Sequence, residues 1–220
     1  ANDHSAGTSG GIVFRAAEAM LIYMEASYEK NGRIDGTADG YWKALRRRAK
    51  VDEDYNKTIA ATQMSEEAKG DFGQLIDATL YNIRRERRNE LCAEALRWED
   101  LKRWRACDQL ISKPYRVEGM LYWGSNYETQ LADLCKVDPA EGNMSSPDLS
   151  KYILPYEKIT KNNLIAGQKG FLFTPAHYLN PIGMAVFRQT ASDKNDFTSS
   201  VVYQNPGWKI EGDTGAQPVE

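Results

Sequence analysis

The stretch ERRNELCAEALRWEDLKRW, at positions 86–104, constrains the fold of this chain more than any other part of the sequence. It interleaves acidic and basic side chains in equal number and ends on a tryptophan. On a helix, residues three and four apart are neighbours, so Arg87, Glu90 and Glu94 share a stripe with the aliphatic side chains before them. Charges on an inward face have to be paired, because each unpaired ion costs several kcal/mol of desolvation. The sequence therefore predicts an internally neutralised network inside a helical frame.

The predicted network is structural, and its members are Arg87, Glu90, Glu94, Arg97, Asp100 and Arg103. From the spacing we expect Arg87 to meet Glu90 or Glu94, and Arg97 or Arg103 to meet Asp100. The tryptophans at 98 and 104 are expected to pack on the aliphatic stems of the arginines. Because such a network is structural, we expect the functional surface of the protein to lie in another part of the chain.

Two functional interpretations of the same stretch are disfavoured. Nucleic-acid binding needs an outer face of arginines without interleaved carboxylates. The whole chain carries 28 Lys and Arg against 31 Asp and Glu, a net charge of -3, so it does not attract polyanions. Catalysis by Glu90 and Glu94 needs one acid with a raised pKa, whereas the surrounding arginines lower it. We therefore expect no nucleic-acid partner.

The chain offers few residues for other catalytic chemistry. His4 and His177 are its only histidines, and no nucleophile elbow, P-loop or dinucleotide-binding glycine pattern is present. A pair of carboxylates, as in glycosidases, stays open because it needs no histidine. The cysteines at 92, 107 and 135 match no zinc spacing, and we expect buried small apolar groups, with a disulfide between two of them as the alternative. No metal or cofactor is predicted.

Apolar periodicity predicts helices over most of the first half of the chain. They cover residues 12–30, 38–50 and 74–95, with a short helix near 66–69 and another through 98–104 that ends before Pro114. Asn31 and Gly32 supply the left-handed end of the first helix. Alanines 16, 19 and 26 lie along one side of it, which would let a second helix approach closely. Helix, glycine loop, helix is the unit of tetratricopeptide repeats.

The second half of the chain, residues 114–220, is predicted to be loop-rich, with short helices and strands. Short apolar pieces at 150–159, 171–182 and 199–210 are broken by prolines and are expected to be extended segments at edges or turns. No linker separates this half from the mainly helical residues 12–113, so we expect 1–220 to form one packed unit. No apolar run approaches the roughly 20 residues of a membrane-spanning helix, and the N-terminal residues lack the apolar core of a signal peptide.

At the charged stretch the sequence resembles the SusD/RagB family of outer-membrane nutrient-binding lipoproteins. The family signature runs roughly E-R-R-x-E-[LF]-x-x-E-G-x-R-[WF]-x-D-L-x-R-W, and residues 86–104 stand in register with it. One departure is Ala95 in place of glycine, which predicts a turn of tighter, α character between the two helices. Further matches are VFRAAEAMLIYMEASYEKNG, the QNPGW at 204–208, and Pro181-Ile182, although Gly183 and Val186 depart from the last of these elements.

The resemblance covers residues 12–208 and corresponds to the C-terminal portion of a family member. It implies an all-α fold of tetratricopeptide-like helix pairs with a long irregular, loop-rich C-terminal part. It also implies a protein that is not an enzyme, has no cofactor and lies on the outer surface of the cell outer membrane through a lipid anchor. The anchor, its signal and the N-terminal half of the protein are expected outside this chain. The implied partners are an oligosaccharide ligand and a SusC-like TonB-dependent outer-membrane transporter.

Sugar capture needs aromatic rings exposed on loops, where pyranose rings can stack, with amides or carboxylates nearby for the hydroxyls. Tyr122, Trp123 and Tyr127 fit that description, and Asn126 supplies an amide. The alternative for Trp123 is burial beneath a long loop. The tryptophans of the family motifs are expected to pack instead: Trp98, Trp104 and Trp208.

Three other functions stay open at this point. One is a member of the same family that binds peptides. Another is a helical-repeat scaffold for a partner protein, which would present a concave groove lined by helices. The third is a glycoside-processing enzyme, which would place two carboxylates about 5–10 Å apart in a cleft.

Overall fold

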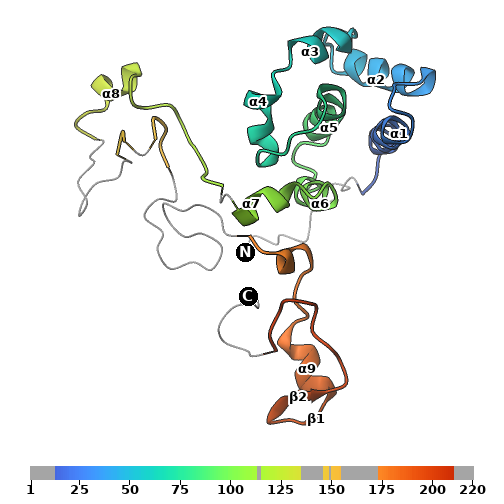
Figure 1. The fold of residues 1–220 in the computed structure, drawn as a ribbon, viewed down its shortest axis with the longest axis vertical. Coiled ribbons are helices and arrows are strands. Elements are labelled where there is room, and N and C mark those ends of the chain that lie inside the picture. Colours follow the sequence, from blue (N-terminus) through green and yellow to red (C-terminus); the bar gives the residue numbers. More distant parts are fainter. Residues whose placement is uncertain (1–12, 113–114, 135–145, 149, 155–172, 211–220) are drawn as a thin grey trace, which may run out of the picture. The chain divides into compact units, whose positions relative to one another are not determined.

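The computed structural model describes residues 13–112, 115–134, 146–148, 150–154 and 173–210. Within these ranges helices predominate and the sheet is one two-stranded hairpin, so the predicted all-α fold class is confirmed (Figure 1). The chain divides into two compact units, Ala1–Trp104 and Arg105–Glu220. The expected packing of 1–220 into one unit stays a prediction, as does the tetratricopeptide character of the helix pairs.

The first unit consists of helices joined by short connections. Their order is α1 (Ala16–Asn31), α2 (Gly36–Arg48), α3 (Tyr55–Ala61), α4 (Met64–Glu67), the 3-10 turn η1 (Ala68–Asp71), α5 (Ala78–Glu90) and α6 (Arg97–Arg103). The helices predicted at 12–30 and 38–50 are present with slightly different ends. Helix α3 was not predicted, because its 7 residues are too few to show an apolar period.

Side-chain caps define where the helices of the first unit begin. The Asp35 carboxylate accepts the backbone N–H of Ala38 at 2.8 Å at the start of α2, and Asp77 accepts two backbone N–H groups at the start of α5. These bonds satisfy donors that the first turn of a helix leaves unpaired. Ser27 of α1 donates to Asp35 at 2.5 Å, and this hydrogen bond is the main cause that lowers the pKa of Asp35. Gly32, with φ 65°, ends α1 in the predicted left-handed conformation.

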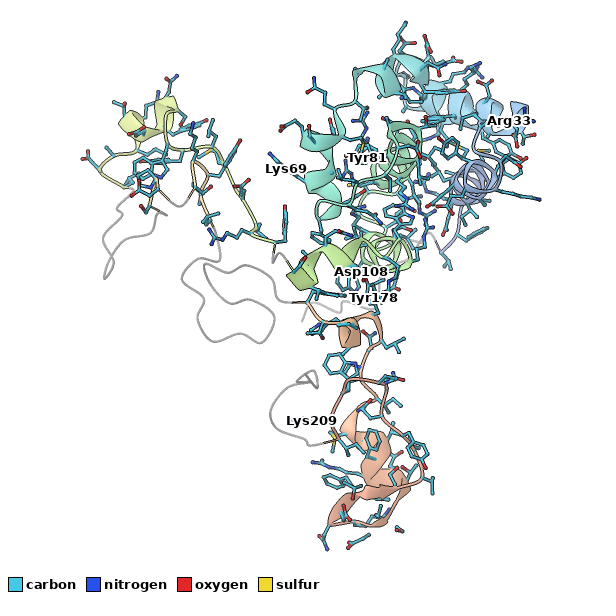
Figure 2. The ribbon with its side chains drawn as sticks, in the orientation of Figure 1. Arg33, Lys69, Tyr81, Asp108, Tyr178 and Lys209 are labelled. Carbon is cyan, nitrogen blue, oxygen red and sulfur yellow. The ribbon has the colours of Figure 1, made fainter. Side chains whose placement is uncertain are left out.

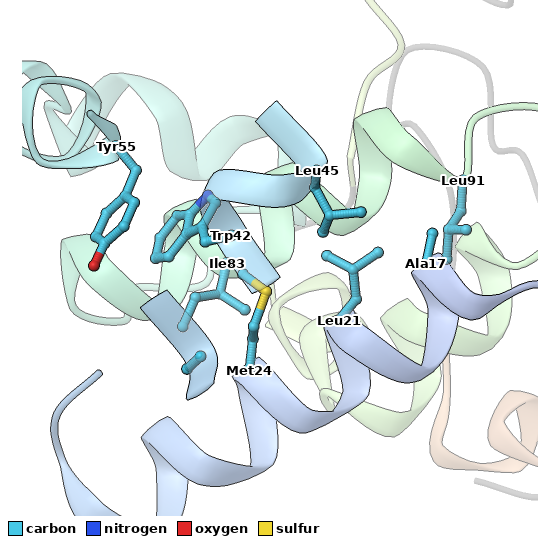
Figure 3. Packing of buried hydrophobic residues seen from close by; sticks show 9 residues of the cluster. Ala17, Leu21, Met24, Trp42, Leu45, Tyr55, Ile83 and Leu91 are labelled. Carbon is cyan, nitrogen blue, oxygen red and sulfur yellow. The ribbon is translucent and has the colours of Figure 1, made fainter. Parts of the chain in front are cut away.

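The core of the first unit lies where α1 packs against α2 and α5. Figure 3 shows Leu21 of α1 facing Leu45 of α2. Trp42 is fully buried, and its ring stacks on Tyr55 with centroids 4.1 Å apart and an interplanar angle of 2°. The Trp42 indole N–H donates to Glu86 at 2.9 Å, which satisfies its one polar atom. The buried cluster comprises Ala17, Leu21, Met24, Ala38, Trp42, Leu45, Tyr55, Ile83 and Leu91.

The alanine stripe of α1 does not serve as a packing face within the described residues. Positions 16, 19 and 26 are exposed, whereas Ala17, Leu21 and Met24 are buried. Successive residues of an α-helix are rotated by about 100°, so the two stripes point in different directions. The second helix packs on the larger apolar side chains, and the expectation that it approaches along the alanines is wrong.

Two left-handed residues separate α5 from α6. Helix α5 ends at Glu90 rather than near 95, and Ala93 and Ala95 then adopt φ of 66° and 60°. The predicted α character at Ala95 is therefore wrong. The turn keeps the left-handed conformation that glycine adopts without steric cost, although an alanine occupies it.

We expect Ala95→Gly to raise the free energy of unfolding by up to about 1 kcal/mol, because it relieves the left-handed penalty of a residue with a Cβ. Ala49 is the matched control, since it is also exposed but ends α2 with an ordinary φ of -73°. Ala49→Gly should lower the same free energy by roughly 0.5 kcal/mol. Urea unfolding of both variants checks this; a destabilised Ala95→Gly protein would contradict the left-handed turn.

The second unit has shorter elements. They are the 3-10 turn η2 (Ala106–Asp108), α7 (Gln109–Ser112), α8 (Asn126–Gln130), the 3-10 turn η4 (Pro175–Tyr178), α9 (Met184–Thr190), β1 (Ala191–Asp193) and β2 (Asp196–Ser200). Strands β1 and β2 pair antiparallel, with Ala191 opposite Ser200 and Asp193 opposite Asp196. Short helices and strands were expected in this half without their positions, and the extended conformation predicted for 171–182 is wrong at η4.

Local chemistry explains why η4 forms where an extended segment was expected. Pro175 occupies the first position of the turn, where its fixed φ suits a helix and its missing N–H costs nothing. The backbone N–H of Thr174 donates to Nδ1 of His177 at 2.9 Å, which ties the start of the turn to its third residue. Burial lowers the pKa of His177, and the accepting nitrogen has to be neutral to hold this bond.

The end of η4 is anchored to η2 (Figure 2). The Tyr178 hydroxyl donates to Asp108 Oδ1 at 2.7 Å, and the Arg105 guanidinium lies 4.5 Å from the centroid of the Tyr178 ring. Burial and the neighbouring carboxylate raise the pKa of Tyr178. The phenol therefore stays protonated and keeps its donor role at physiological pH.

The QNPGW motif at 204–208 forms a clip that holds residues 177–182. The Gln204 amide accepts the Ile182 N–H at 2.7 Å and donates to the Ile182 carbonyl at 3.0 Å, as a paired strand would. Pro206 and Gly207 form the corner of a type II turn, with Gly207 at φ 82° and Trp208 N–H donating to the Asn205 carbonyl at 3.2 Å. The motif is therefore structural in this chain.

Further contacts of the clip involve its other polar side chains. Asn205 donates to the Asn180 carbonyl at 2.7 Å, and Trp208 Nε1 donates to the Leu179 carbonyl at 2.7 Å. The Trp208 ring meets His177 edge to face at 5.3 Å. The expectation that Trp208 packs agrees with these contacts.

The cysteines only partly follow the sequence-based expectation. Cys107 is buried, whereas Cys92 is exposed in the turn after α5, so the prediction of a buried Cys92 is wrong. The third, Cys135, lies outside the described residues, as does His4.

Candidate ligand-binding site

Glu25 of α1 lies at the centre of the charged interior of the first unit. Its side chain is 5% exposed and accepts hydrogen bonds from Arg84 Nε at 3.2 Å, Arg103 Nη2 at 2.6 Å and the Trp104 indole N–H at 2.5 Å. Because donors from α5, α6 and the residue after α6 converge on one carboxylate of α1, this cluster joins three helices. Sequence reasoning missed Glu25, since its position between apolar residues of α1 gives no local sign of its partners.

Arg87 and Asp100 form the second part of the network. Arg87 Nε donates to both carboxylate oxygens of Asp100, at 2.9 and 2.8 Å, and Arg103 Nε donates to the same carboxylate at 2.9 Å. Glu18 lies 3.6 Å from Arg87 Nη2. Asp100 of α6 is therefore joined to α5 through Arg87, while Arg103 holds the same carboxylate from within α6. The pair Arg103 and Asp100 is one that the sequence spacing predicted, whereas Arg87 has a different partner from the one expected.

Glu90 and Glu94 meet Arg15 rather than Arg87. Arg15 Nη1 donates to Glu90 at 2.5 Å and Nη2 donates to Glu94 at 2.7 Å, while Arg48 Nη2 contacts the other Glu90 oxygen at 2.5 Å. Since α5 ends at Glu90 and the chain then turns, Glu94 is not on the helical stripe with Arg87. The hydrogen bonds to Glu94 and Glu90 raise the pKa of Arg15, and Arg15 lowers the pKa of Glu94. A Glu94 held ionised cannot act as a general acid.

The aromatic contacts of the network centre on Trp104. This residue is 5% exposed, and guanidinium carbons of Arg84 and Arg103 lie 4.6 and 4.9 Å from its ring centroid. Arg97 donates to the buried Asp71 at 2.5 Å and lies 5.7 Å from the same ring. Cations over an indole face are favourable, and more so where water is excluded.

Trp98 differs from the other tryptophan of the stretch. It is 43% exposed, with the Lys102 ammonium 5.9 Å from its ring centroid. The expected neighbour of this ring was an arginine stem, whereas the cation beside it is a lysine and the ring is not buried.

The charged cluster has little capacity left for a ligand. Among the described residues, Arg87 Nη1 is the one buried side-chain nitrogen or oxygen atom without a hydrogen-bond partner. Acids and bases satisfy each other, and no group of three or more His, Cys, Asp or Glu side chains in the described ranges is placed to hold a metal ion. Within the described residues the cluster therefore joins α1, α5 and α6 through its own acids and bases.

The aromatic segment of the second unit comprises residues 118–127 and 150–153. An antiparallel bridge between Leu121 and Tyr152 joins its two parts. The adjoining Tyr122 is 2% exposed, and the ring of Trp123 meets it edge to face at 5.0 Å. The expectation that Tyr122 offers an exposed ring is therefore not met, and Tyr122 supports Trp123 from beneath. Trp123 is half-buried, between the two alternatives that its sequence context allowed.

Asn126 and Tyr127 lie in the first turn of α8, not in a loop. Ser125 Oγ accepts the Tyr127 N–H at 3.2 Å, and Glu128 Oε2 accepts the Gly124 N–H at 2.8 Å, so both sides of the helix start are capped. Gly124 reaches this turn with φ 80°. Asn126 is exposed and Tyr127 is 43% exposed, which leaves both side chains accessible beside Trp123 in the chain.

Tyr152 is an aromatic residue of this segment that sequence reasoning did not single out. It is 39% exposed and lies across the bridge from Leu121. Its sequence, SKYILP, carries no aromatic run or glycine, and the long-range bridge is what places it opposite Leu121. No helix among the described residues is long and apolar enough to traverse a lipid bilayer.

The described residues therefore show an all-α fold whose charged interior pairs its own acids and bases, with exposed aromatic side chains in the second unit. The family model described as the SusD family, SusD_RagB, matches residues 1–208, and the chain belongs to this family. Its members are nutrient-binding proteins, not enzymes, associated with the surface of the outer membrane. Neither the comparison with curated proteins nor the comparison with solved structures gives a match.

Proposed function

We propose that this chain is the ligand-capturing part of a cell-surface glycan uptake system. It binds oligosaccharides and delivers them to a SusC-like TonB-dependent transporter, and a lipid anchor holds the protein on the outer membrane. The observation that carries the proposal is the family match over residues 1–208. The aromatic segment of the second unit supports it, because accessible rings flanked by polar side chains suit sugars.

In this proposal the residues of the segment have separate roles. Trp123 stacks on the apolar face of a pyranose ring while Tyr122 holds it from behind. Tyr127 adds a second ring, and the Asn126 amide bonds a hydroxyl. The protein carries out no bond cleavage, so the ligand leaves as it entered.

Native affinity electrophoresis tests the proposal. The full chain should migrate more slowly in gels that contain at least one of starch, a mixed-linkage β-glucan, a mannan or a xylan. Trp123→Ala should weaken that retardation by about tenfold, the effect of roughly 1.4 kcal/mol of lost stacking. Trp98→Ala is the control, since Trp98 is 43% exposed but belongs to the first unit, and it should bind as the wild type does.

Other outcomes would contradict the proposal in different ways. Unretarded migration in every gel, together with binding to a peptide mixture, would favour the peptide-binding alternative within the family. Release of reducing ends from any of the polysaccharides would show an enzyme. If the Trp123→Ala variant is retarded as strongly as the wild type, the proposal of glycan capture stands but Trp123 is not part of the site.

A further inference from the structure

Backbone hydrogen bonds join the segment that carries Trp123 to residues 150–153. The donors and acceptors are Gly119 N–H to Ile153 O at 2.7 Å, Ile153 N–H to Met120 O at 2.9 Å, Tyr122 N–H to Lys151 O at 3.0 Å and Trp123 N–H to Lys151 O at 3.1 Å. The bonds at Met120 and Tyr122 flank the bridge between Leu121 and Tyr152. This is the pattern of a narrow, non-hydrogen-bonded antiparallel pair.

A narrow pair brings two side chains onto the same side of the ladder. In such pairs the Cβ atoms are about 4.5–5.5 Å apart, so Leu121 and Tyr152 are neighbours on one face. Both are substantially exposed, at 42% and 39%. Tyr122, the next residue, points to the opposite side and is buried at 2%. Tyr122 is therefore a buried, supporting side chain, whereas Tyr152 is exposed on the other face.

The backbone of Tyr152 is held in place although its ring is exposed. Its N–H, which faces away from the partner segment in a narrow pair, donates to Ser150 Oγ at 3.0 Å, and Ser150 Oγ donates in turn to Glu118 at 3.3 Å. Among the described residues, no hydrogen bond, ion pair or ring contact engages the Tyr152 side chain itself. A ring held on an ordered backbone loses little conformational entropy when a ligand stacks on it.

The surroundings of Tyr152 suit a ligand with both an apolar face and hydroxyl groups. The aliphatic side chain of Leu121 extends the apolar surface of the ring. Glu118 and Ser150 supply a carboxylate and a hydroxyl that bond each other within the same pair of segments. A sugar hydroxyl can add a hydrogen bond to either group, whereas a purely apolar ligand would cover them without a new partner.

We infer that Tyr152 is a further ligand-contacting residue that stacks on a second sugar ring, an inference that rests on the proposed function. Trp123 lies in the turn that begins at Tyr122, where Ser125 N–H donates to the Tyr122 carbonyl at 3.1 Å, whereas Tyr152 is carried by the opposite segment of the bridge. The rings of Trp123 and Tyr152 therefore stack on different sugar units of one oligosaccharide. The site consequently selects oligosaccharides over single sugars, and Tyr152 contributes to affinity only when a second unit is present.

The test uses the polysaccharide that retards the wild-type chain, followed by calorimetric titration with its monosaccharide, disaccharide and trisaccharide. Tyr152→Ala should weaken trisaccharide binding by about tenfold and leave monosaccharide binding unchanged, and Tyr152→Phe should stay within about twofold of the wild type. Tyr203→Ala is the control, since Tyr203 is 88% exposed in the same unit but outside the aromatic segment.

The results separate this inference from the proposed function. If the wild type binds a glycan and Tyr152→Ala binds the trisaccharide equally well, the role of Tyr152 is overturned while glycan capture stands. The same holds if Tyr152→Ala weakens monosaccharide and trisaccharide equally. If the wild type binds none of the polysaccharides, the proposed function fails and the inference with it. Unfolding by urea should be the same for both Tyr152 variants as for the wild type, because the substituted side chain is exposed.

Discussion

Glu25→Gln is expected to lower the free energy of unfolding by about 3–5 kcal/mol, the cost of breaking a buried ion pair from one side. Glu25 is the shared acceptor of Arg84, Arg103 and the Trp104 indole. A neutral amide leaves the Arg84 side chain, which is 7% exposed, without its buried counter-charge. The amide also offers one acceptor oxygen where three donors converge. The helices α1, α5 and α6 would therefore lose their common attachment.

Glu29→Gln is the matched control for this experiment. Glu29 also accepts from Arg84, at 3.3 Å, but its side chain is 50% exposed. Water replaces such a partner easily, so the expected loss is below about 1 kcal/mol. Urea unfolding followed by circular dichroism at 222 nm measures both variants. Equal losses for the two would mean that burial of Glu25 does not decide its contribution.

Gly207→Ala is expected to destabilise the clip of the second unit by about 2–5 kcal/mol, the sum of overpacking and left-handed strain. An added Cβ would lie 2.6 Å from Cβ and 3.3 Å from Cα of Ala176, and neither atom can rotate away. The residue also has φ 82°, which a side chain opposes. The Asn205–Trp208 turn would open and release the residues that it holds near η4.

Gly124→Ala separates the two causes. Gly124 has nearly the same φ, 80°, but an added Cβ would meet nothing within 4 Å. It should cost only the conformational part, about 1–2 kcal/mol. Hydrogen exchange of the backbone amides at 173–208 measures opening of the clip directly. If urea unfolding gives Gly207→Ala and Gly124→Ala the same loss of free energy, the close approach of Gly207 to Ala176 contributes nothing.

The helical half of the fold could be predicted because its information is local. Apolar periodicity marks α1 and α2, and the left-handed end of α1 at Gly32 is predicted from Asn31 and Gly32. Short elements escaped prediction for the same reason. Helix α3 and the η4 turn contain too few residues to show a period, so capping and tertiary contacts decide them.

The candidate site was predicted less completely. Sequence reasoning selected the aromatic and glycine-rich segment, and Trp123, Asn126 and Tyr127 remain accessible there or partly so. It could not tell that Tyr122 turns inward, because which residues of a strand face inward depends on its pairing with another segment. It missed Tyr152 for the same reason, since the partner of Leu121 lies far along the chain.

The ion pairs of the charged stretch at 86–104 could be predicted only in part from local sequence. Its composition and helical spacing determined that these arginines and carboxylates would neutralise one another in a helical interior, since unpaired buried charges are too costly to persist. Only the tertiary structure decided which acid meets which base. The left-handed turn at Ala93 and Ala95 moves Glu94 off the stripe of Arg87, and Arg15 meets it across a separation of 79 residues. Which long-range pairs form depends on how the helices pack. That packing cannot be derived from side-chain spacing within one helix.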